Sequence, residues 1–289
     1  MEPPSTPPTH PAPPGLTNRV SNCYFNSAVQ SFMALPIITK RLLDMAPVDG
    51  LVGELQRLVE QFFAGHKLVD AVPLLYELNK IVKFKIGIQH DAGEFLLYLI
   101  KHLEEKFPQI ATHVRGEHRI VRTCGGCGHE SISIVGYNNI VLDPTAANTN
   151  LIGLMVKNSI ADEIFDTFNC DAAVCVNSKT SNTPNRGATR RWSMLKIPDV
   201  LILTVVSKFT AMPKLKLNFV EFKPDDKPRY HELTSIILHH GSSTSGHYNA
   251  IIRWGKIWYF IDDTRVSIIK LCDMENMIIN HTCQLIYSI

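Results

Sequence analysis

The sequence predicts an α+β fold, with helices in the first part of the chain and strands in the rest. Up to about residue 112, apolar residues recur at the three- and four-residue spacings of amphipathic helices. Beyond residue 115, segments rich in β-branched and aromatic residues are bounded by Gly, Pro, Asn or Asp. Helices that precede strands, instead of alternating with them, favour the α+β class.

Three helices are predicted in the first part of the chain. The first spans residues 23–35, with Ser21 and Asn22 as its N-cap and Pro36 as its stop. The second spans residues 51–63, and the third starts near Asp91 and ends before Pro108. Their inward faces carry Phe25, Ala28, Val29, Phe32 and Met33; then Leu55, Leu58, Val59 and Phe62; then Phe95, Leu96, Leu99 and Leu103.

Strands are predicted at residues 131–142, 200–207, 233–239, 248–254, 256–261 and 284–289. The most basic short stretch, residues 186–191, contains Gly and Thr and is interpreted as an exposed loop. Residues 1–14 are Pro-rich and almost without large apolar side chains, so we expect a disordered arm. A ligand for an SH3-type domain is the alternative interpretation of this arm.

The composition is that of an ordinary globular protein. With 289 residues, 45% hydrophobic and 19% charged, the chain can bury a substantial core. A net charge of +2 without a basic run argues against nucleic acid, and no apolar stretch is long enough for a membrane span. The N-terminus lacks the pattern of a signal peptide, and 7 cysteines suit thiols and metal ligands. We therefore expect a cytoplasmic or nuclear protein.

Cys23 stands at the start of the first predicted helix. Unpaired backbone N–H groups and the helix dipole at this position stabilise a thiolate and lower the pKa of a thiol. The alternative is a buried structural cysteine. Because Cys23 lies at the cap and not on the apolar face, the sequence favours a reactive thiol.

His247 and Asp262 lie at the ends of two consecutive predicted strands, and a hairpin would bring their side chains together. An acid beside a histidine fixes the tautomer of the ring, so that the other ring nitrogen accepts the proton of a thiol. The chain has 12 histidines, so spacing alone leaves both a Cys23–His247–Asp262 triad and a chance arrangement open.

Four blocks of the sequence resemble the ubiquitin-specific protease family. Residues 15–27, GLTNRVSNCYFNS, resemble the family's Cys box, G-L-x-N-x-G-N-T-C-Y-x-N-S. Residues 89–96 and 200–209 resemble two further family segments, and the His box is matched by residues 239–241, 246–250 and 258–263. The blocks follow the family's order and cover nearly the whole chain after residue 15.

The resemblance implies a papain-like fold that is described as a hand. A single catalytic domain, residues 15–289, would hold a helical thumb in residues 15–112, and a palm sheet with zinc ribbon-like fingers in residues 113–289. Val20 and Asn22 stand where the family has glycine and threonine. A β-branched residue in place of glycine is expected to change the shape of the loop before Cys23.

The resemblance also implies catalytic roles. Cys23 would be the nucleophile, His247 the general base and Asp262 the acid that orients it. Asn18 matches the asparagine of the oxyanion hole, which stabilises charge on the scissile carbonyl; a turn asparagine is its alternative. Asp263 could share the orienting role. Because none of these positions is lost, we expect an active enzyme.

Asp91 and Glu94 match family positions near the arginine-containing tail of the substrate, and Asp91 is the stronger candidate for an arginine contact. Asp-x-x-Glu before an apolar run is also an ordinary capping arrangement, so both roles stay open. His239, Phe209 and Tyr248 are likewise assigned to substrate binding by the resemblance. For Phe209 and Tyr248 a place in the core is the alternative.

Two cysteine pairs, Cys124-x2-Cys127 and Cys170-x4-Cys175, are candidates for a structural Zn²⁺ site. Four thiolates in two pairs are what a tetrahedral zinc requires, and the fingers of the family commonly carry such pairs. The longer spacing in the second pair leaves unliganded thiols as the alternative, and His129 is a possible substitute ligand.

The function implied by the resemblance is thiol-dependent hydrolysis of the isopeptide or peptide bond after the C-terminal Gly-Gly of ubiquitin or a ubiquitin-like modifier. The expected partners are ubiquitin or such a modifier and its conjugates, bound by a monomer. Two alternatives stay open: a protease for another modifier or for a polyprotein ending in Gly-Gly, and a catalytically silent ubiquitin-binding scaffold.

Overall fold

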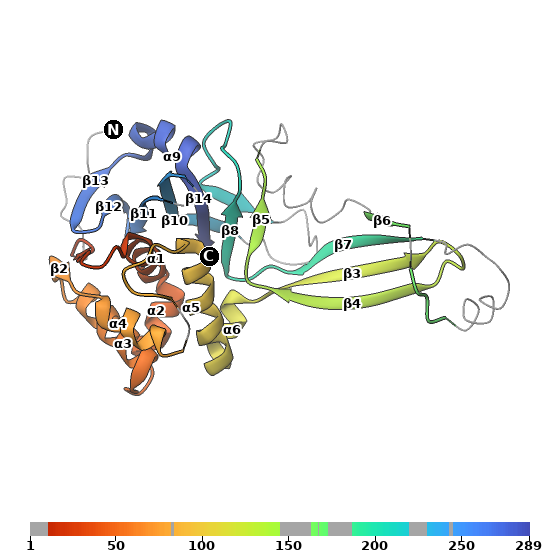
Figure 1. Ribbon diagram of the computed structural model, residues 1–289, viewed down its shortest axis with the longest axis horizontal. Coiled ribbons are helices and arrows are strands. Elements are labelled where there is room, and N and C mark those ends of the chain that lie inside the picture. The colour runs from red at the N-terminus through yellow and green to blue at the C-terminus, as the bar shows by residue number, and fades with distance from the viewer. Residues whose placement is uncertain are drawn as a thin grey trace.

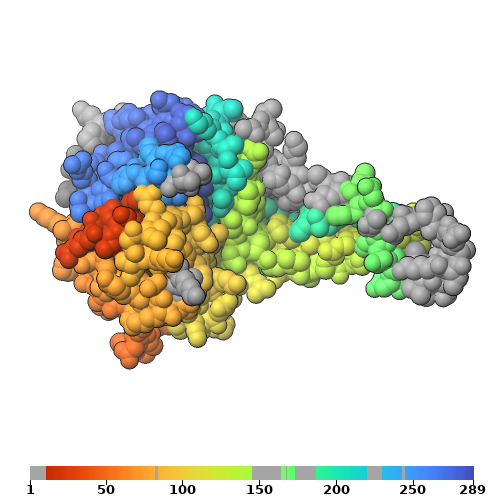
Figure 2. Space-filling view, in the orientation of Figure 1, coloured from red at the N-terminus to blue at the C-terminus, as the bar shows by residue number. Residues whose placement is uncertain are grey.

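The computed structural model describes residues 11–81, 84–144, 163–166, 168–172, 187–219, 230–242 and 245–289. Figure 1 shows a body in which helices lie against a sheet, and a narrow second sheet that projects from the body. The space-filling view in Figure 2 shows the same two parts, with the projecting sheet joined to the body at one end. The predicted α+β fold, with a helical thumb, a palm sheet and fingers, is confirmed.

The helices of the described chain are α1 (Cys23–Met33), α2 (Pro36–Leu43), α3 (Gly50–Phe63), α4 (Val72–Asn79), α5 (Ala92–Lys106), α6 (Pro108–Val114), the 3-10 helix η2 (Leu271–Met274) and α9 (Glu275–His281). The three predicted helices correspond to α1, α3 and α5. The sequence missed α2, α4 and α6, each of which has a proline in its first turn. A proline at that position starts a helix as readily as it stops the preceding one. None of the helices in the described parts is both long and apolar enough to cross a membrane.

Helix α1 is the central helix of the body. All of its residues are buried, between α5 and the palm sheet, and the ring of Phe25 lies 5.0 Å from that of Phe95. The predicted N-cap is wrong in its chemistry, because the side chain of Asn22 accepts no hydrogen bond from the first turn of α1. Its Oδ1 instead accepts from the preceding backbone N–H groups of Arg19 and Val20.

The palm is one sheet with the strand order β13-β12-β11-β10-β14-β8-β5, and β9 pairs with β10. Its strands are β5 (Ile140–Leu142), β8 (Val200–Val205), β9 (Lys216–Asn218), β10 (Tyr230–Gly241), β11 (Gly246–Trp254), β12 (Ile257–Asp262), β13 (Arg265–Ile269) and β14 (Thr282–Ser288). Side chains alternate between two cores: Ile237 and Ile252 face the helices, whereas Ile236 and Ile251 belong to the core on the other side. Both faces of the palm are therefore buried, which fixes the strand register.

The fingers are a separate antiparallel sheet with the order β4-β3-β7-β6. Its strands are β3 (Gly116–Cys124), β4 (Glu130–Tyr137), β6 (Glu163–Phe165) and β7 (Ala188–Lys196). The single strand predicted at 131–142 is wrong, because the chain leaves the fingers after β4 and enters the palm as β5. Between them, Asn138 Nδ2 donates to Glu104 Oε2 at 2.9 Å and to the carbonyl of Val114 at 3.2 Å, which ties the base of the fingers to the thumb.

The loop predicted at residues 186–191 is also wrong for its described part, because β7 begins at Ala188. The guanidinium of Arg190 lies 4.8 Å from the centre of the Phe165 ring and 4.9 Å from that of Trp192. Contacts with aromatic rings stabilise the charged side chain on the surface of a strand. The charge of the stretch had suggested a loop, whereas its alternation fits a strand.

Residues 1–10 of the predicted disordered arm lie outside the described chain. Pro11–Pro14 are described, and the prediction is wrong for them: Pro13 and Pro14 are buried, and the carbonyl of Pro14 accepts from Gln30 Nε2 at 2.7 Å. The chain then forms β1 (Gly15–Leu16), which pairs in parallel with β2 (Leu68–Val69). Proline rings are apolar and their carbonyls are acceptors, so a Pro-rich segment can be fixed where donors meet it.

Candidate active site

The hairpin of β11 and β12 brings His247 and Asp262 together, as the sequence predicted. His247 is the second residue of β11 and Asp262 the last of β12, and His247 Nε2 lies 2.6 Å from Asp262 Oδ1. A carboxylate only accepts, so the ring nitrogen Nε2 carries the proton. This tautomer leaves Nδ1 of His247 as the nitrogen that can take a proton.

Two residues that support this pair were missed at the sequence level. Asn249 is buried and donates from Nδ2 to the same Oδ1 of Asp262 at 2.9 Å. Gln89 holds the start of β11 from outside the sheet, because the backbone N–H of Gly246 donates to its Oε1 at 3.1 Å and its Nε2 donates to the carbonyl of Gly246. The two-residue spacing of a strand, which places Asn249 on the face of His247, is the signal that could have found it.

Cys23 is the first residue of α1 and its side chain is 2% exposed. Burial raises the pKa of the Cys23 thiol; the backbone N–H of Tyr248 opposes this shift, and the nearby carboxylate of Asp263 adds to it. The backbone N–H groups of Cys23 and Tyr24 at the helix start do lower this pKa, as expected, but desolvation outweighs them and the net direction is upward. The contact with Tyr248 places the thiol beside the residue that follows His247.

The loop before Cys23 is closed by the side chain of Asn22, which is fully buried. Its Oδ1 accepts from the two preceding N–H groups, and its Nδ2 donates to the carbonyl of Thr17 and to Asn26 Oδ1. The backbone strain falls on Ser21, with φ of 54°, and not on Val20. The loop thus accepts Val20 in place of the family's glycine because another residue takes the left-handed conformation.

Asn18 and Asp263 are bonded to each other. Asn18 Nδ2 donates to Asp263 Oδ2 at 2.8 Å, and Asn18 Oδ1 accepts from the backbone N–H of Asn22 at 3.0 Å. The other carboxylate oxygen of Asp263 accepts from Asn26 Nδ2 at 2.7 Å. Asp263 therefore holds the loop that carries Asn18, whereas Asp262 holds His247. The structure separates the two acids that the sequence had left interchangeable.

Asp91, Tyr248 and His239 form a second polar group beside the site. Asp91 caps α5, where its Oδ1 accepts from the N–H of Glu94 at 2.7 Å, and its Oδ2 accepts from the hydroxyl of Tyr248 at 3.3 Å. The ring of His239 lies 4.4 Å from that of Tyr248, since the two residues are directly opposite on β10 and β11. Both roles left open for Asp91 are compatible with these contacts, because Asp91 is itself exposed to solvent.

Phe209 does not join this group. It is 5% exposed and belongs to the core on the far side of the palm, whereas Tyr248 belongs to the core that faces the helices. The structure therefore favours the core interpretation for Phe209.

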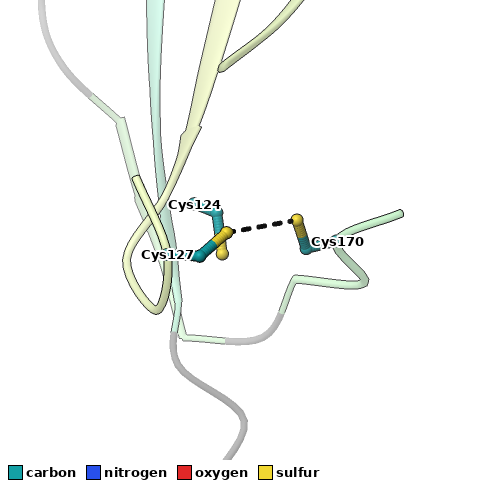
Figure 3. A group of neighbouring side chains, drawn as sticks. All are labelled: Cys124, Cys127 and Cys170. Carbon is teal, nitrogen blue, oxygen red and sulfur yellow. Dashed lines mark hydrogen bonds between the residues drawn. The ribbon is translucent and has the colours of Figure 1, made fainter. Parts of the chain in front are cut away.

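Three cysteines meet in the fingers (Figure 3). Cys124 ends β3, Cys127 lies in the turn that follows, and Cys170 comes from a segment farther along the chain. Their sulfur atoms all lie within 4.8 Å of one another, and Cys127 Sγ is 3.8 Å from Cys170 Sγ. Two thiolates bound at about 2.3 Å to one tetrahedral Zn²⁺ would be about 3.8 Å apart, so this arrangement suits a metal. Cys175 lies outside the described residues.

Comparison with known proteins identifies the family of this chain. Residues 14–284 match the family model described as "Ubiquitin carboxyl-terminal hydrolase". The chain belongs to this family, as the resemblance to ubiquitin-specific proteases predicted. It is similar to ubiquitin carboxyl-terminal hydrolase 26 of Oryza sativa subsp. japonica (27% identical, covering 88% of this chain and 26% of the relative) and to ubiquitin carboxyl-terminal hydrolase 36 of Drosophila mojavensis (21% identical, 91% and 25%). The chain thus spans about a quarter of the length of these curated relatives.

Among solved structures, the fold is similar to a chain of the SAGA Ubp8/Sgf11/Sus1/Sgf73 deubiquitinase module bound to ubiquitin aldehyde. The TM-score is 0.76 at 19% sequence identity, and the match covers 95% of this chain and 69% of that one. A structure of the same module bound to monoubiquitin gives a TM-score of 0.78, also at 19% identity, over 95% and 68% of the two chains. At this identity the likeness shows the fold.

Proposed function

We propose that this chain is a thiol-dependent deubiquitinase, which hydrolyses the bond after the C-terminal Gly-Gly of ubiquitin. The observation that carries this proposal is the hydrogen bond between His247 and Asp262 at the open end of the β11–β12 hairpin. The next residue after His247 is Tyr248, whose backbone N–H contacts the Cys23 thiol. Membership of the ubiquitin carboxyl-terminal hydrolase family supports the reaction type. The fold neighbours that carry ubiquitin aldehyde and monoubiquitin support the choice of modifier.

In this mechanism the resting thiol is neutral, because burial raises the pKa of Cys23. His247 Nδ1 removes the proton as the sulfur attacks the carbonyl of the terminal glycine. Nε2 keeps its bond to Asp262, which stabilises the imidazolium that forms. The imidazolium then protonates the leaving amine, and water, activated by the same ring, frees the acyl group from Cys23.

Asn18 supplies the oxyanion donor in this proposal. The bond to Asp263 and the bond from the Asn22 N–H hold the Asn18 amide in one orientation before substrate arrives. A donor that is fixed in advance needs no reorganisation as charge develops on the substrate oxygen. Asp263 is then a positioning residue for Asn18 and not a second partner of His247.

Substrate recognition is proposed for the polar group of Asp91, Tyr248 and His239, with the exposed Glu94 beside it. The carboxylate of Asp91 already accepts from the N–H of Glu94 and the hydroxyl of Tyr248. An arginine of the modifier tail could use its remaining lone pairs in a charge-assisted hydrogen bond. The burial of the Tyr248 hydroxyl, which raises the pKa of Tyr248, keeps that side chain neutral.

We further propose that Cys124, Cys127 and Cys170, with Cys175 as fourth ligand, hold a structural Zn²⁺. Support comes from the sulfur separation and from the turn at Cys127, in which the N–H of Gly126 donates to Cys124 Sγ at 3.4 Å. Such N–H groups stabilise ligating thiolates. The metal would join the end of the β3–β4 hairpin to the segment of Cys170, and it takes no part in the reaction at Cys23.

The proposal is tested with ubiquitin that carries a thiol-reactive warhead at its C-terminus. We expect the wild-type chain to be labelled, Cys23→Ala to escape labelling, and Cys272→Ala, which removes an exposed thiol, to be labelled as the wild type is. Labelling of Cys23→Ala would contradict the assignment of Cys23 as the nucleophile. Binding of ubiquitin without labelling of the wild type would identify a silent scaffold, and labelling only by another modifier would replace ubiquitin. A monomer is expected in solution at sedimentation equilibrium.

A further inference from the structure

The end of β11 that is farther from His247, beside the β11–β12 turn, carries an aromatic contact with the N-terminal segment. Trp254, the last residue of β11, is 7% exposed, and its indole N–H donates to the carbonyl of Pro11 at 2.9 Å. The ring of Phe63 lies 5.2 Å from that of Trp254 at an interplanar angle of 31°. The indole N–H of Trp254 thus contacts the carbonyl of Pro11, and the ring of Phe63 packs against the indole from α3.

Gly65 completes the contact. A Cβ at this position would lie 3.2 Å from Cβ and 3.4 Å from Cγ of Pro11, closer than nearly all side-chain contacts. The residue also has φ of 80°, which favours glycine. The absence of a side chain in the turn after α3 therefore lets the exposed ring of Pro11 approach the backbone of Gly65.

The segment in this space is chemically suited to it. Pro11-Ala12-Pro13-Pro14 has fixed φ at its prolines, and Ala12 and Pro13 are held extended because each precedes a proline. Such a segment approaches a polyproline II helix, whose carbonyls point outward and have no partners of their own. Grooves lined with aromatic side chains that donate to such carbonyls are a general way to bind Pro-rich segments.

We propose that Trp254, Phe63 and Gly65 form a binding site for a proline-rich segment, and that Pro11–Pro14 of the same chain is its occupant. Because the segment is covalently attached, it binds at a high effective concentration and with little loss of entropy. The site is distinct from the proposed ubiquitin site, which lies around Cys23 and Asp91.

The docked segment leads directly into the catalytic loop. After Pro14, the backbone of Gly15 lies so close to Thr264 that a Cβ would come within 2.5 Å of its carbonyl oxygen. The N–H of Leu16 donates to the carbonyl of Asp263 at 2.8 Å, and that residue holds Asn18. In Figure 2 this N-terminal part, in red, lies between the blue sheet and the orange helices. In this proposal, docking at Trp254 adds to the contacts that hold β1, the strand before the loop of Asn18.

The first experiment measures the exchange of indole N–H protons with water by NMR in the full chain. Trp254→Phe, which keeps a ring and removes the donor, assigns the Trp254 signal, and Trp192→Phe serves as the matched control in the fingers. In the double variant Pro11→Gly, Pro13→Gly we expect the Trp254 signal to exchange at least about fivefold faster, the factor that corresponds to one net hydrogen bond. An unchanged rate for Trp254 would overturn the docked segment.

The second experiment tests the class of ligand. A peptide with the sequence of residues 5–14, STPPTHPAPP, is titrated into the same double variant, alongside a peptide of equal length in which glycine and serine replace the prolines. We expect the first peptide to shift the Trp254 indole signal and to slow its exchange, with no shift at Trp192. Since linked segments of this kind act at millimolar effective concentrations, the absence of a shift at about 10 mM peptide would overturn the site.

The link to the active site rests on the proposed function and has its own readout. In Trp254→Phe we expect the backbone amides of Leu16 and Thr17 to exchange about fivefold faster by mass spectrometry, and kcat on a ubiquitin C-terminal amide to fall about two- to fivefold with KM unchanged. Faster exchange with unchanged kcat would refute the link while the binding site stands. An inactive wild-type chain would refute the proposed function, and both NMR experiments would still decide the site.

Discussion

The body and the fingers hold their functional side chains by different means. In the body, each carboxylate of the site accepts hydrogen bonds from protein donors. Asp262 accepts from His247 and Asn249, and Asp263 accepts from Asn18 and Asn26. In the fingers, the sheet is exposed on its outer strand, where Ile132 and Ile134 are 55% and 60% exposed. A small sheet that is open to solvent on both faces cannot bury enough apolar surface to hold its far end in place.

This difference bears on the zinc site proposed for the fingers. The palm is buried on both faces, so packing and hydrogen bonds suffice to set the catalytic distances. Among the described residues the fingers have no such core, and a metal on the proposed thiol cluster would hold the segment of Cys170, which follows the edge strand β6, against the end of β3. We therefore expect substitutions in the body to change the rate with little effect on stability, and substitutions in the thiol cluster to do the reverse.

The largest effect is expected for Asp262→Ala. Without the carboxylate, His247 loses its tautomer and its orientation, so kcat should fall by about 10²–10⁴, while the unfolding temperature stays within a few degrees. Steady-state hydrolysis of a ubiquitin C-terminal amide measures this, with the exposed Asp273→Ala as control. Equal losses in Asp262→Ala and Asp263→Ala would show that the two acids are interchangeable after all.

The next largest effect is expected for Asn18→Ala. Loss of one oxyanion donor should lower kcat by about 10²–10³ and leave KM nearly unchanged, because the donor acts on the charge of the transition state. Single-turnover acylation of Cys23 gives the step directly, and Asn280→Ala, at a partly exposed position on α9, is the control. A rise in KM without a change in kcat would instead make Asn18 a binding residue.

The sequence predicted the catalytic hairpin well because strand patterns fix which residues share a face. His247 and Asp262 meet through the simplest long-range contact, a hairpin between consecutive strands. It could not predict the direction of the thiol pKa, since that depends on how completely α1 is buried between α5 and β11. Nor could the sequence assign different roles to Asp262 and Asp263. The backbone at Asp263 has φ of 51°, and its side chain bonds to Asn18 and Asn26 and not to His247.

The sequence was least reliable where one pattern has two meanings. Prolines 36 and 108 were interpreted as helix stops, although each also starts a further helix. Residues 131–142 were predicted as one strand although Gly136, Asn138 and Asn139 interrupt the pattern. Asn138 bonds to the thumb where the chain passes from the fingers to the palm. The Pro-rich arm suggested disorder because it has almost no large apolar side chains, and the donors that hold Pro11 and Pro14, Trp254 and Gln30, lie outside the arm.

In the fingers, Cys127→Ser should remove the metal. We expect zinc content to fall from about one equivalent to near zero, and the unfolding temperature to fall by at least roughly 5 °C, because loss of a structural metal costs more than about 2 kcal/mol. Labelling of Cys23 by the ubiquitin warhead should persist at low temperature. The exposed Cys272→Ser is the control, and zinc retained in Cys127→Ser would contradict the site.

A smaller effect in the body is expected for Asp263→Asn. The Asp263 carboxylate raises the pKa of the Cys23 thiol, second among the raising causes after burial, so its neutralisation lowers that pKa. At pH 8 more thiolate is then present, and alkylation of Cys23 by iodoacetamide should be about threefold faster. Alkylation of Cys272 in the same sample is the internal control. Slower alkylation in the variant would show that the loop, and not the charge, governs the thiol.

The smallest effect concerns His118 in β3, which stacks on Tyr137 at 4.2 Å. Burial lowers the pKa of His118 below its ordinary value of 6.5, so the folded state binds the proton less readily than the unfolded state. The stability present above pH 6.5 is therefore lost as the pH falls through that value. Because the half-buried ring still reaches solvent, we expect this loss of folding free energy to be less than about 1 kcal/mol. The unfolding temperature of His118→Gln should then drop less on acidification than that of the wild type. The exposed His66→Gln should behave as wild type, and an equal drop in all three chains would place the acid sensitivity of the fingers elsewhere.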